Sequence, residues 1–235
     1  MSLKTMIIGA SALALLAACG DKSSETSAPS AEISVPELPH VRTVTIPADD
    51  QFVTHLKTAL ITADEGDTIQ LPEGTFNLTD GLSLDVDRVT LAGAGQGKTI
   101  LSFKGQQGAG EGLLVTSDDV TLTGFTMQDT AGDGIKSKGA DRITYSDLTV
   151  EWTGGPLATN GAYGVYPVES TDVLVDAVTV RGASDAGIYV GQSRNIIVRN
   201  SLVEYNVAGI EIENSIGADV HGNTCLLYTS DAADE

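Results

Sequence analysis

Basic residues are scarce in this chain of 235 residues. It has 13 lysines and arginines against 32 aspartates and glutamates, and its formal net charge is −19. Proteins that bind nucleic acid or anionic lipid need a basic surface that neutralises phosphate groups. The composition therefore excludes nucleic acid as a partner and argues against broad attraction to anionic lipid. A polyanionic substrate would need a local basic patch or a bridging divalent cation.

Histidine is rarer still. The three histidines are His40, His55 and His221, and no two of them are close in the sequence. A site for a transition metal needs histidine or cysteine ligands at close and regular spacing. The sequence offers no such cluster, which weakens any role in copper handling.

Glycine, in contrast, recurs in a regular frame. The pattern glycine, apolar residue, any residue, apolar residue returns with steps of 22, 30, 23 and 22 residues, starting at Gly112, Gly134, Gly164, Gly187 and Gly209. A second short apolar alternation follows each frame, and a third follows four of the five. Three strands in a repeat of about 22 residues, with Gly, Asn, Asp and Ser at the corners and no helical period, predict a parallel β-helix.

We therefore predict an all-β protein whose residues 45–224 form one single-stranded parallel β-helix domain. Earlier turns are less regular but fit the same scheme at 68–71, 82–84 and 88–91. Asparagine tolerates the left-handed backbone of tight corners, so the corner asparagines need no shared chemical role. They are Asn195, Asn200, Asn206, Asn214 and Asn223.

An amphipathic helix is predicted at residues 50–63, with Asp49 or Asp50 as its N-cap. Its apolar face consists of Phe52, Val53, Leu56, Ala59, Leu60 and Ala63. A stack of strands has open backbone edges at its ends, and a helix of this kind can cap the N-terminal end. An amphipathic membrane helix is the rival interpretation, but Lys57 alone supplies too little basic charge for it.

The first residues have the pattern of an export signal. Lys4 precedes an apolar stretch from Met6 to Leu16, and Leu-Ala-Ala-Cys ends at Cys19. This stretch is too short to remain as a spanning helix. Residues 1–18 resemble a bacterial lipoprotein signal peptide, which implies a lipid-modified Cys19 and an anchor in the cell envelope, on the periplasmic or outer-membrane side. Residues 19–44 are rich in Ser, Pro, Glu and Ala and predict a disordered tether.

The last residues, 225–235, leave the repeat pattern in the middle of a turn. Back-translated, they resemble the adapter of a transposase-based sequencing library read as codons. We therefore expect this segment not to be native, and the β-helix to be truncated at its C-terminal end near Thr224. With Cys19 lipidated and Cys225 outside the native chain, no disulfide is expected, and stacked apolar residues must stabilise the fold.

Side chains alternate along a strand, so each glycine frame has an inward and an outward set. The outward residues form two columns, which are Leu114, Lys136, Tyr166, Tyr189 and Glu211, and Thr116, Lys138, Val168, Gly191 and Glu213. Aromatic rings beside hydrogen-bonding groups suit sugars, whose faces are apolar and whose edges carry hydroxyls. We predict a substrate-binding face that contains Tyr166, Tyr189, Lys138 and Glu211. The extra residues of the 30-residue step predict a loop beside this face, whereas Trp152 continues the inward parity of its strand.

The stretch Tyr163-Gly164-Val165-Tyr166-Pro167-Val168-Glu169 resembles the Tyr-Gly-Phe-Asp-Pro-His-Glu motif of mannuronan C5-epimerases, right-handed β-helices that act on alginate. The resemblance implies that a uronate carboxylate is neutralised and that a proton leaves C5 and returns from the opposite face. Tyr166 and Val168 replace the ionisable Asp and His of the motif. The candidate catalytic residues that remain are Lys136 to neutralise the carboxylate, Tyr163 to donate a proton and Glu169 as a base. Glu211 could replace Glu169 as base or, with Glu213 on the same strand, suit calcium.

Residues 46–224 also resemble bacterial lipoproteins with parallel β-helix repeats, on the stretches 160–170, 184–193 and 208–214. This resemblance implies a right-handed, pectin-lyase-like β-helix in the cell envelope. Two functions stay open. The protein binds or modifies an acidic polysaccharide, as an epimerase- or lyase-type protein with an incomplete catalytic motif, or it is a non-catalytic envelope scaffold or accessory protein similar to NosD-type β-helix proteins.

Overall fold

The computed structural model describes residues 41–108 and 110–226. The expected signal peptide, the lipidation site Cys19, most of the expected tether and residues 227–235 lie outside the described residues. Within the described part of the chain, no helix has the length and apolar character needed to cross a membrane.

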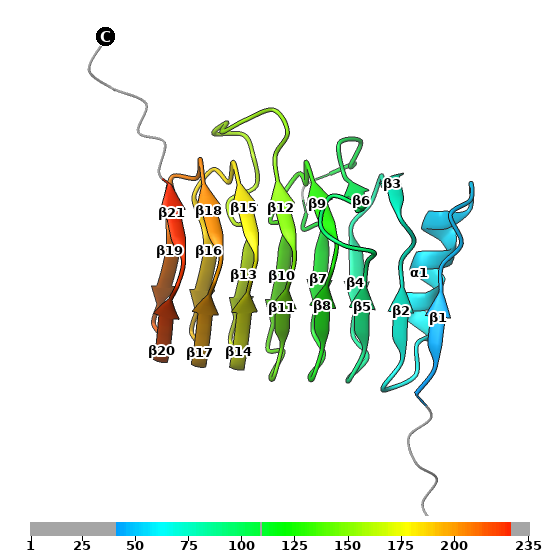
Figure 1. Cartoon of the computed structure of the whole chain (residues 1–235), viewed down its shortest axis with the longest axis horizontal. Coiled ribbons are helices and arrows are strands. Elements are labelled where there is room, and N and C mark those ends of the chain that lie inside the picture. The colour runs from blue at the N-terminus through cyan, green and yellow to red at the C-terminus, as the bar shows by residue number, and fades with distance from the viewer. Residues whose placement is uncertain (1–40, 109, 227–235) are drawn as a thin grey trace, which may run out of the picture. The chain divides into compact units, whose positions relative to one another are not determined.

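Three parallel sheets form the walls of a solenoid, and each complete turn of the chain contributes one strand to each wall (Figure 1). The eight-stranded sheet contains, in spatial order, β1 (Thr43–Thr45), β2 (Thr68–Gln70), β5 (Thr90–Ala92), β8 (Thr121–Thr123), β11 (Thr144–Ser146), β14 (Thr171–Asp176), β17 (Arg194–Arg199) and β20 (Ile216–His221). The six-stranded sheet contains β4 (Leu82–Leu84), β7 (Leu113–Val115), β10 (Ile135–Lys138), β13 (Val165–Val168), β16 (Ala186–Gly191) and β19 (Ala208–Glu213). The seven-stranded sheet contains β3 (Gly74–Asn77), β6 (Thr99–Ser102), β9 (Thr126–Gln128), β12 (Thr149–Glu151), β15 (Thr179–Arg181), β18 (Leu202–Glu204) and β21 (Thr224–Leu226).

The predicted parallel β-helix is thus confirmed, and its boundaries extend slightly further than the sequence indicated. β1 begins two residues before the expected start of the domain, and β3 and β6 are strands that the pattern did not reveal. Cys225 and Leu226, which we expected not to be native, continue β21 in register with Val203 and Glu204.

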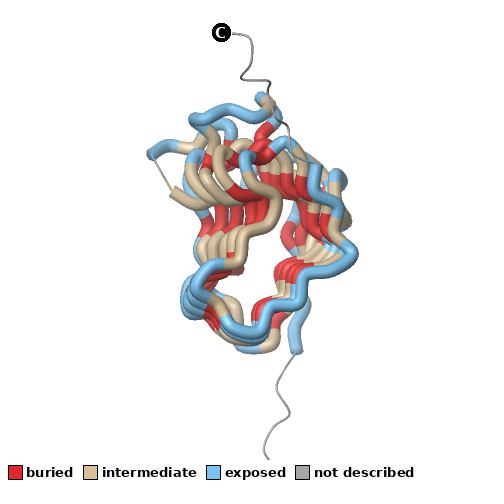
Figure 2. The backbone as a smooth tube through the Cα atoms, turned by 90° about the vertical axis from the view of Figure 1, so that its left-hand side faces the viewer, coloured by how far each residue is buried: buried red, intermediate tan, exposed pale blue. Residues whose placement is uncertain are grey.

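The core lies inside the three walls, because one side of every strand is apolar. Ile135, Val165 and Ile188 stack on one another in neighbouring turns, and each is fully buried. Burying a side chain of this size contributes roughly 1.5–3 kcal/mol, and the stack repeats the gain in every turn. Figure 2, which looks along the stack, shows buried segments recurring at the same places in successive turns. The inward polar residue Ser137 accepts a hydrogen bond of 2.5 Å from the buried Tyr145 hydroxyl.

The frame glycines are needed because successive turns approach closely. A Cβ added at Gly134 would lie 2.5 Å from the carbonyl oxygen of Gly164, and one added at Gly164 would lie 2.8 Å from that of Gly187. The same relation holds from Gly112 to Gly134 and from Gly187 to Gly209. Each frame glycine therefore leaves room for the backbone of the next turn, which explains its regular return in the sequence.

The helix α1 (Phe52–Thr62) packs against β3 and β4 at the N-terminal end of the stack, as predicted (Figure 1). Phe52, Leu56, Ala59 and Leu60 are buried, and the ring of Phe52 stacks on that of Phe76. The predicted N-cap was wrong, because Gln51 occupies that position and makes no capping hydrogen bond through its side chain. The Asp49 carboxylate instead accepts a hydrogen bond of 2.9 Å from the Gln51 backbone N–H.

The corner asparagines divide into two kinds. Asn195, Asn200 and Asn214 adopt the left-handed backbone that the sequence suggested. Asn206 and Asn223 do not, and instead connect turns through their side chains. Asn206 accepts a hydrogen bond from the Ala183 N–H and donates one to the Val180 carbonyl, and Asn223 makes the corresponding bonds with Ser201 and Val198. The side chains of the second kind thus bond to backbone groups of the preceding turn and help to satisfy them.

Candidate functional site

The first outward column of the six-stranded sheet contains four of the predicted site residues in the predicted order, namely Lys136, Tyr166, Tyr189 and Glu211. Lys136 lies between Leu114 and Tyr166 on the neighbouring strands, and Tyr189 is paired with Glu211. Each of these side chains is partly exposed, while the residues on either side of them in the strands are mostly buried. The alternation therefore presents these side chains together on one outer face.

Three tyrosine rings meet on this face. The rings of Tyr163 and Tyr189 stack with their centroids 4.5 Å apart. Tyr166 contacts both, at 4.8 Å from Tyr163 and at 5.2 Å from Tyr189 in an edge-on geometry. We name this group the tyrosine cluster. The sequence predicted the adjacency of Tyr166 and Tyr189, but not that Tyr163, which precedes β13, would join them.

Lys136 is held beside the cluster by an aromatic ring and two acids. Its ammonium nitrogen lies 4.8 Å from the centre of the Tyr166 ring, a cation–π contact. It also lies 3.3 Å from a carboxylate oxygen of Glu111 and 3.9 Å from one of Asp133. The positive charge of Lys136, which we expected to neutralise a uronate carboxylate, is thus already balanced by acids of the protein.

Three carboxylates near the cluster were missed from the sequence, namely Glu111, Asp133 and Asp185. The pKa of Asp133 is raised, chiefly by burial, although the Tyr163 backbone N–H donates a hydrogen bond of 3.2 Å to this carboxylate and Lys136 opposes the shift. Glu111 and Asp133 each directly precede a frame glycine. That repeated position is the signal that would have identified them.

The hydroxyls of Tyr163 and Tyr189 are proton donors at neutral pH. The Tyr189 hydroxyl donates a hydrogen bond of 2.7 Å to Glu213, and this bond is the main reason that the pKa of Tyr189 lies above its ordinary value. Burial, followed by the charge of Asp185, raises the pKa of Tyr163. Neither phenol therefore serves readily as a base, whereas both can donate a hydrogen bond or a proton to a bound oxygen.

The second outward column lies further along the same strands. Lys138 pairs with Val168, and its ammonium is 3.9 Å from the Glu169 carboxylate. Glu169 occupies a left-handed corner, with φ of 56°, directly after β13. Tyr163 precedes that strand. Tyr163 and Glu169 are therefore six positions apart along a nearly extended chain, about 20 Å of backbone. The structure brings Lys136 to Tyr163 but does not bring Glu169 to them.

The two positions that depart from the epimerase motif also have defined environments. Tyr166 belongs to the cluster. Val168 is nearly buried, although it faces outward, and it lies next to Gly191 and the ring of Tyr189. The ring covers Gly191 closely, since a Cβ there would be 2.9 Å from the ring edge. An apolar patch thus occupies the place where the motif has an ionisable histidine.

No group of three or more His, Cys, Asp or Glu side chains in the described residues is arranged to hold a metal ion. Glu211 and Glu213 extend from one strand, and the pKa of Glu211 is raised by burial and then by repulsion from Asp185 and Glu213. A calcium ion shared between these carboxylates and a substrate stays a prediction.

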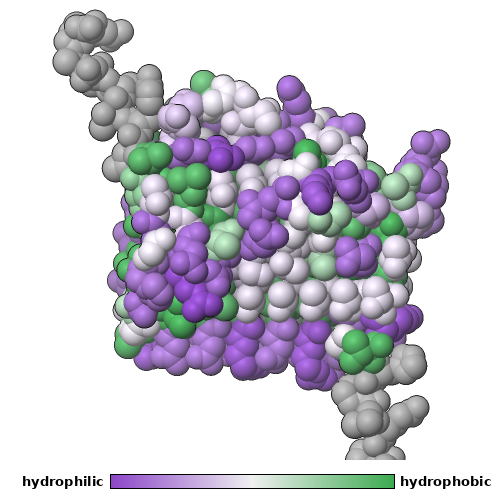
Figure 3. All heavy atoms as spheres, in the orientation of Figure 1, coloured by the Kyte–Doolittle hydropathy of each residue, from purple (hydrophilic) through white to green (hydrophobic). Residues whose placement is uncertain are grey.

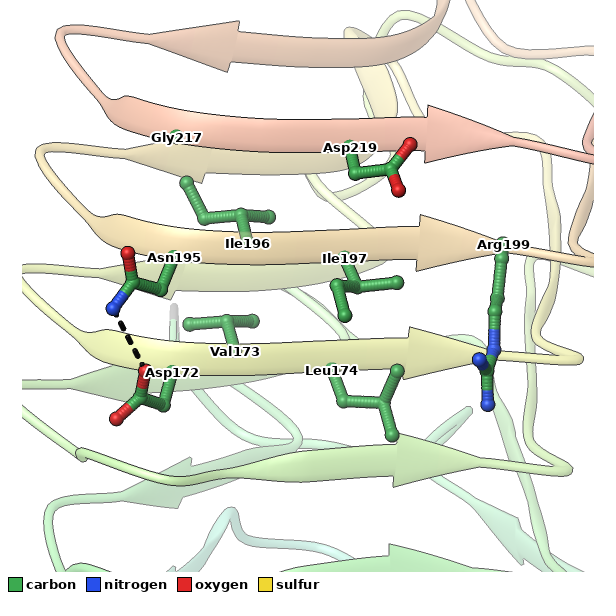
Figure 4. A pocket seen from close by; sticks show the side chains of 9 residues that line it. All are labelled: Asp172, Val173, Leu174, Asn195, Ile196, Ile197, Arg199, Gly217 and Asp219. Carbon is green, nitrogen blue, oxygen red and sulfur yellow. Dashed lines mark hydrogen bonds between the residues drawn. The ribbon is translucent and has the colours of Figure 1, made fainter.

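A hollow lies on the eight-stranded sheet, where Leu174 and Ile197 project side by side from β14 and β17 (Figure 4). The Asn195 amide donates a hydrogen bond of 3.0 Å to Asp172 at one end, and Arg199 lies at the other. No aromatic residue lines this hollow. It lacks the ring surface that makes the tyrosine cluster a candidate for sugar binding.

The fold and the sequence together show the family to which the chain belongs. The sequence pattern of the family described as "Right handed beta helix region" matches residues 91–228, more than half of the chain, and the chain belongs to this family.

Among characterised proteins, the chain is similar to mannuronan C5-epimerase AlgE6 of Azotobacter vinelandii, with 25% identity over 193 residues, which cover 78% of this chain and 20% of that protein. The chain thus spans about one fifth of the length of this relative.

Solved structures of similar fold include a mutant pectin methylesterase in complex with a hexasaccharide (TM-score 0.49, 13% identity, 74% of this chain and 62% of that one). They also include the A-module of Azotobacter vinelandii mannuronan C5-epimerase AlgE4 (TM-score 0.43, 15% identity, 74% of this chain and 68% of that one).

Proposed function

We propose that this protein binds a polysaccharide along the outer face of its six-stranded sheet. The tyrosine cluster is the observation that carries this proposal. Three rings in mutual contact, partly exposed and bordered by hydrogen-bonding groups, provide apolar surface for sugar faces and polar partners for their hydroxyls. The similarity to an epimerase of alginate supports a polysaccharide as the ligand.

Chemical modification of an acidic polysaccharide is the second candidate function. Lys136 and Tyr163, the cation and the proton donor expected for an epimerase- or lyase-type reaction, lie together at the cluster. The base expected from the motif is the missing element, since Glu169 lies at the far end of β13 and Val168 cannot bind a proton. Asp133 beside Lys136, Asp185 near Tyr163 or Glu211, one turn beyond Tyr189, would have to replace it. We therefore favour binding over turnover.

Anchoring in the bacterial cell envelope is part of the same proposal and rests on the sequence alone. Lipidation at Cys19 and a tether over residues 19–44 would hold the solenoid near the membrane, on its periplasmic or outer-membrane side. Expression of the full chain and of its Cys19→Ser variant, with metabolic labelling by a fatty acid, tests this. Label in the variant, or none in the parent, would contradict the anchor.

Binding is tested with two pairs of substitutions on the two large outer faces. Replacing Tyr166 and Tyr189 by Ala should cost about 2 kcal/mol of binding, roughly thirtyfold in affinity, because the apolar platform is lost. Replacing Thr90 and Thr121 of the eight-stranded sheet by Ala is the matched control and should change nothing. Calorimetric titration with alginate, pectate and neutral glycans gives the affinities, and circular dichroism verifies folding. Equal loss in both pairs would reject the tyrosine cluster as the site.

Turnover is tested in the same samples. Proton NMR of alginate and pectate after incubation, with and without calcium, detects inversion at C5 or new unsaturated ends. The proposal predicts binding without either product. If no polysaccharide is bound or altered under any condition, the protein is a scaffold or accessory protein of the envelope instead.

A further inference from the structure

The charges around the tyrosine cluster define the class of glycan, provided that the cluster is the binding site proposed above. Two lysines lie on this face, and both already have carboxylate partners. Lys136 is close to Glu111 and Asp133, and Lys138 is close to Glu169. Within the described residues, no lysine on this face is therefore left without a carboxylate partner to receive the carboxylates of a polyuronate.

Three further carboxylates flank the stacked pair of Tyr163 and Tyr189. Glu211 is the strand neighbour of Tyr189, Glu213 accepts the hydrogen bond of the Tyr189 hydroxyl, and the charge of Asp185 acts on Tyr163. Among the residues that the structure describes, no lysine, arginine or histidine forms an ion pair with any of these three. The raised pKa of Glu211 agrees with this, since repulsion from Asp185 and Glu213 adds to the effect of its burial.

The rings themselves favour a cation. The face of an aromatic ring carries negative electrostatic potential and attracts ammonium groups. The cluster already shows this preference, because the Lys136 ammonium lies 4.8 Å above the Tyr166 ring. Aromatic surface with an excess of negative charge attracts a protonated amine and repels a uronate.

We propose that the polysaccharide bound at the tyrosine cluster carries protonated amino groups, as a polymer of amino sugars does. The apolar face of a sugar ring lies against Tyr163 and Tyr189, and its ammonium group points to the carboxylates of Asp185, Glu211 and Glu213. An acidic polysaccharide, the sequence-based expectation, is bound more weakly because the same carboxylates repel it.

The test is a calorimetric titration of the full chain with three hexasaccharides of equal length at low ionic strength and about pH 6, where most amino groups of glucosamine carry a proton. The ligands are glucosamine hexasaccharide, its N-acetylated form and a hexauronate. The glucosamine form should bind about tenfold more tightly than the N-acetylated form, from one cation–π contact and one exposed ion pair. The hexauronate should bind most weakly.

Three other results would overturn the inference, and they differ in what they say of the binding site. Equal affinity for the charged and the N-acetylated sugar means that the face binds glycans without recognising the amine, and the proposed function survives. Tightest binding of the hexauronate reverses the charge argument but also leaves polysaccharide binding intact. Absence of binding by all three removes the proposed function together with this inference.

A charge-neutral variant isolates the three carboxylates. The combination Asp185→Asn, Glu211→Gln and Glu213→Gln should reduce affinity for the glucosamine form to that for the N-acetylated form and leave the latter unchanged. Asp50→Asn with Glu73→Gln, two exposed acids outside this sheet, is the control and should preserve the difference. In the unmodified chain, about 1 M salt should also abolish the difference, because charges are then screened over about 3 Å. A preference that survives both the triple variant and high salt would show that the carboxylates do not produce it.

Discussion

The outer faces of the eight-stranded and six-stranded sheets differ in how long one residue type repeats from turn to turn. On the former, one outward column reads threonine in five successive turns, at Thr43, Thr68, Thr90, Thr121 and Thr144. The corresponding column of the latter changes at almost every turn, from Ser83 and Leu114 through Lys136 and the tyrosines to Glu211.

Bands of similar hydropathy crossing the turns are visible on the surface in Figure 3. Threonine suits an exposed strand position in any turn because its branched side chain fits the pleated surface. A column that repeats one residue type is therefore explained by strand formation alone. A column that departs from repetition needs another reason. On the eight-stranded sheet the departure begins at Leu174 and Ile197, at the hollow described above. On the six-stranded sheet it coincides with the tyrosine cluster.

The largest effect on stability is expected from a change in the spacing of turns beneath the tyrosine cluster. Gly134→Ala introduces a Cβ that meets the Gly164 carbonyl oxygen at 2.5 Å and also collides with Val150. We expect a loss of roughly 2 kcal/mol or more in the free energy of unfolding, because an overpacked core must displace backbone. Urea unfolding measures it. Gly105→Ala is the control, since its Cβ would enter open space, and a similar loss there would remove the spacing argument.

A smaller effect should distinguish the two faces, namely the way in which the melting temperature of a variant on each face depends on pH. Glu211 has a raised pKa, so the folded state binds its proton more tightly than the unfolded state does, and its charge costs stability above that pKa. Glu211→Gln should therefore raise the melting temperature at neutral pH. The gain should vanish as the pH falls through the raised pKa towards the ordinary value of 4.5.

Asp176 on the eight-stranded sheet should behave in the opposite way. Hydrogen bonds, first from Arg199 and then from Asn200, lower its pKa, so its contribution is fully present above the ordinary value of 3.8 and is lost as the pH falls through the lowered pKa. Asp176→Asn should therefore lower the melting temperature at neutral pH and have little effect in strong acid. Melting curves over a pH series compare the two variants, and shifts of the same sign at neutral pH would contradict the contrast.

The smallest effect is expected within the threonine column. Thr121→Val retains the branched shape that suits a strand and should change the free energy of unfolding by no more than about 0.5 kcal/mol. Glycan affinity should not change at all. Urea unfolding and calorimetric titration test both statements, and a clear loss of affinity would mean that the threonine face also contributes to binding.

The sequence predicted the solenoid and the two outward columns because a buried face fixes the register of a strand. Lys136, Tyr166 and Tyr189 were placed correctly for that reason. Tyr163 could not be placed, since it precedes its strand and the alternation of faces does not extend to it.

The corners of the solenoid show the same limit of prediction from the sequence. Asn195 and Asn206 are the same residue type, yet one supplies a left-handed backbone and the other bonds two turns together through its side chain. Glu111, Asp133 and Asp185, beside the cluster, were also outside the reach of strand parity. Asp133 lies in the loop before β10, and it accepts a hydrogen bond from the backbone of Tyr163 in the following turn.

The frame glycines have a consequence for how such a protein changes in length. Each frame glycine leaves room for the carbonyl oxygen of the frame glycine in the next turn. A duplicated turn therefore fits between two others with the same packing contacts. Every added turn extends the outer face by about 4.8 Å, the spacing of neighbouring strands. A polymer lying along the stack would then gain one further contact per turn. The affinity would therefore rise with the number of turns, and no pocket would have to change shape.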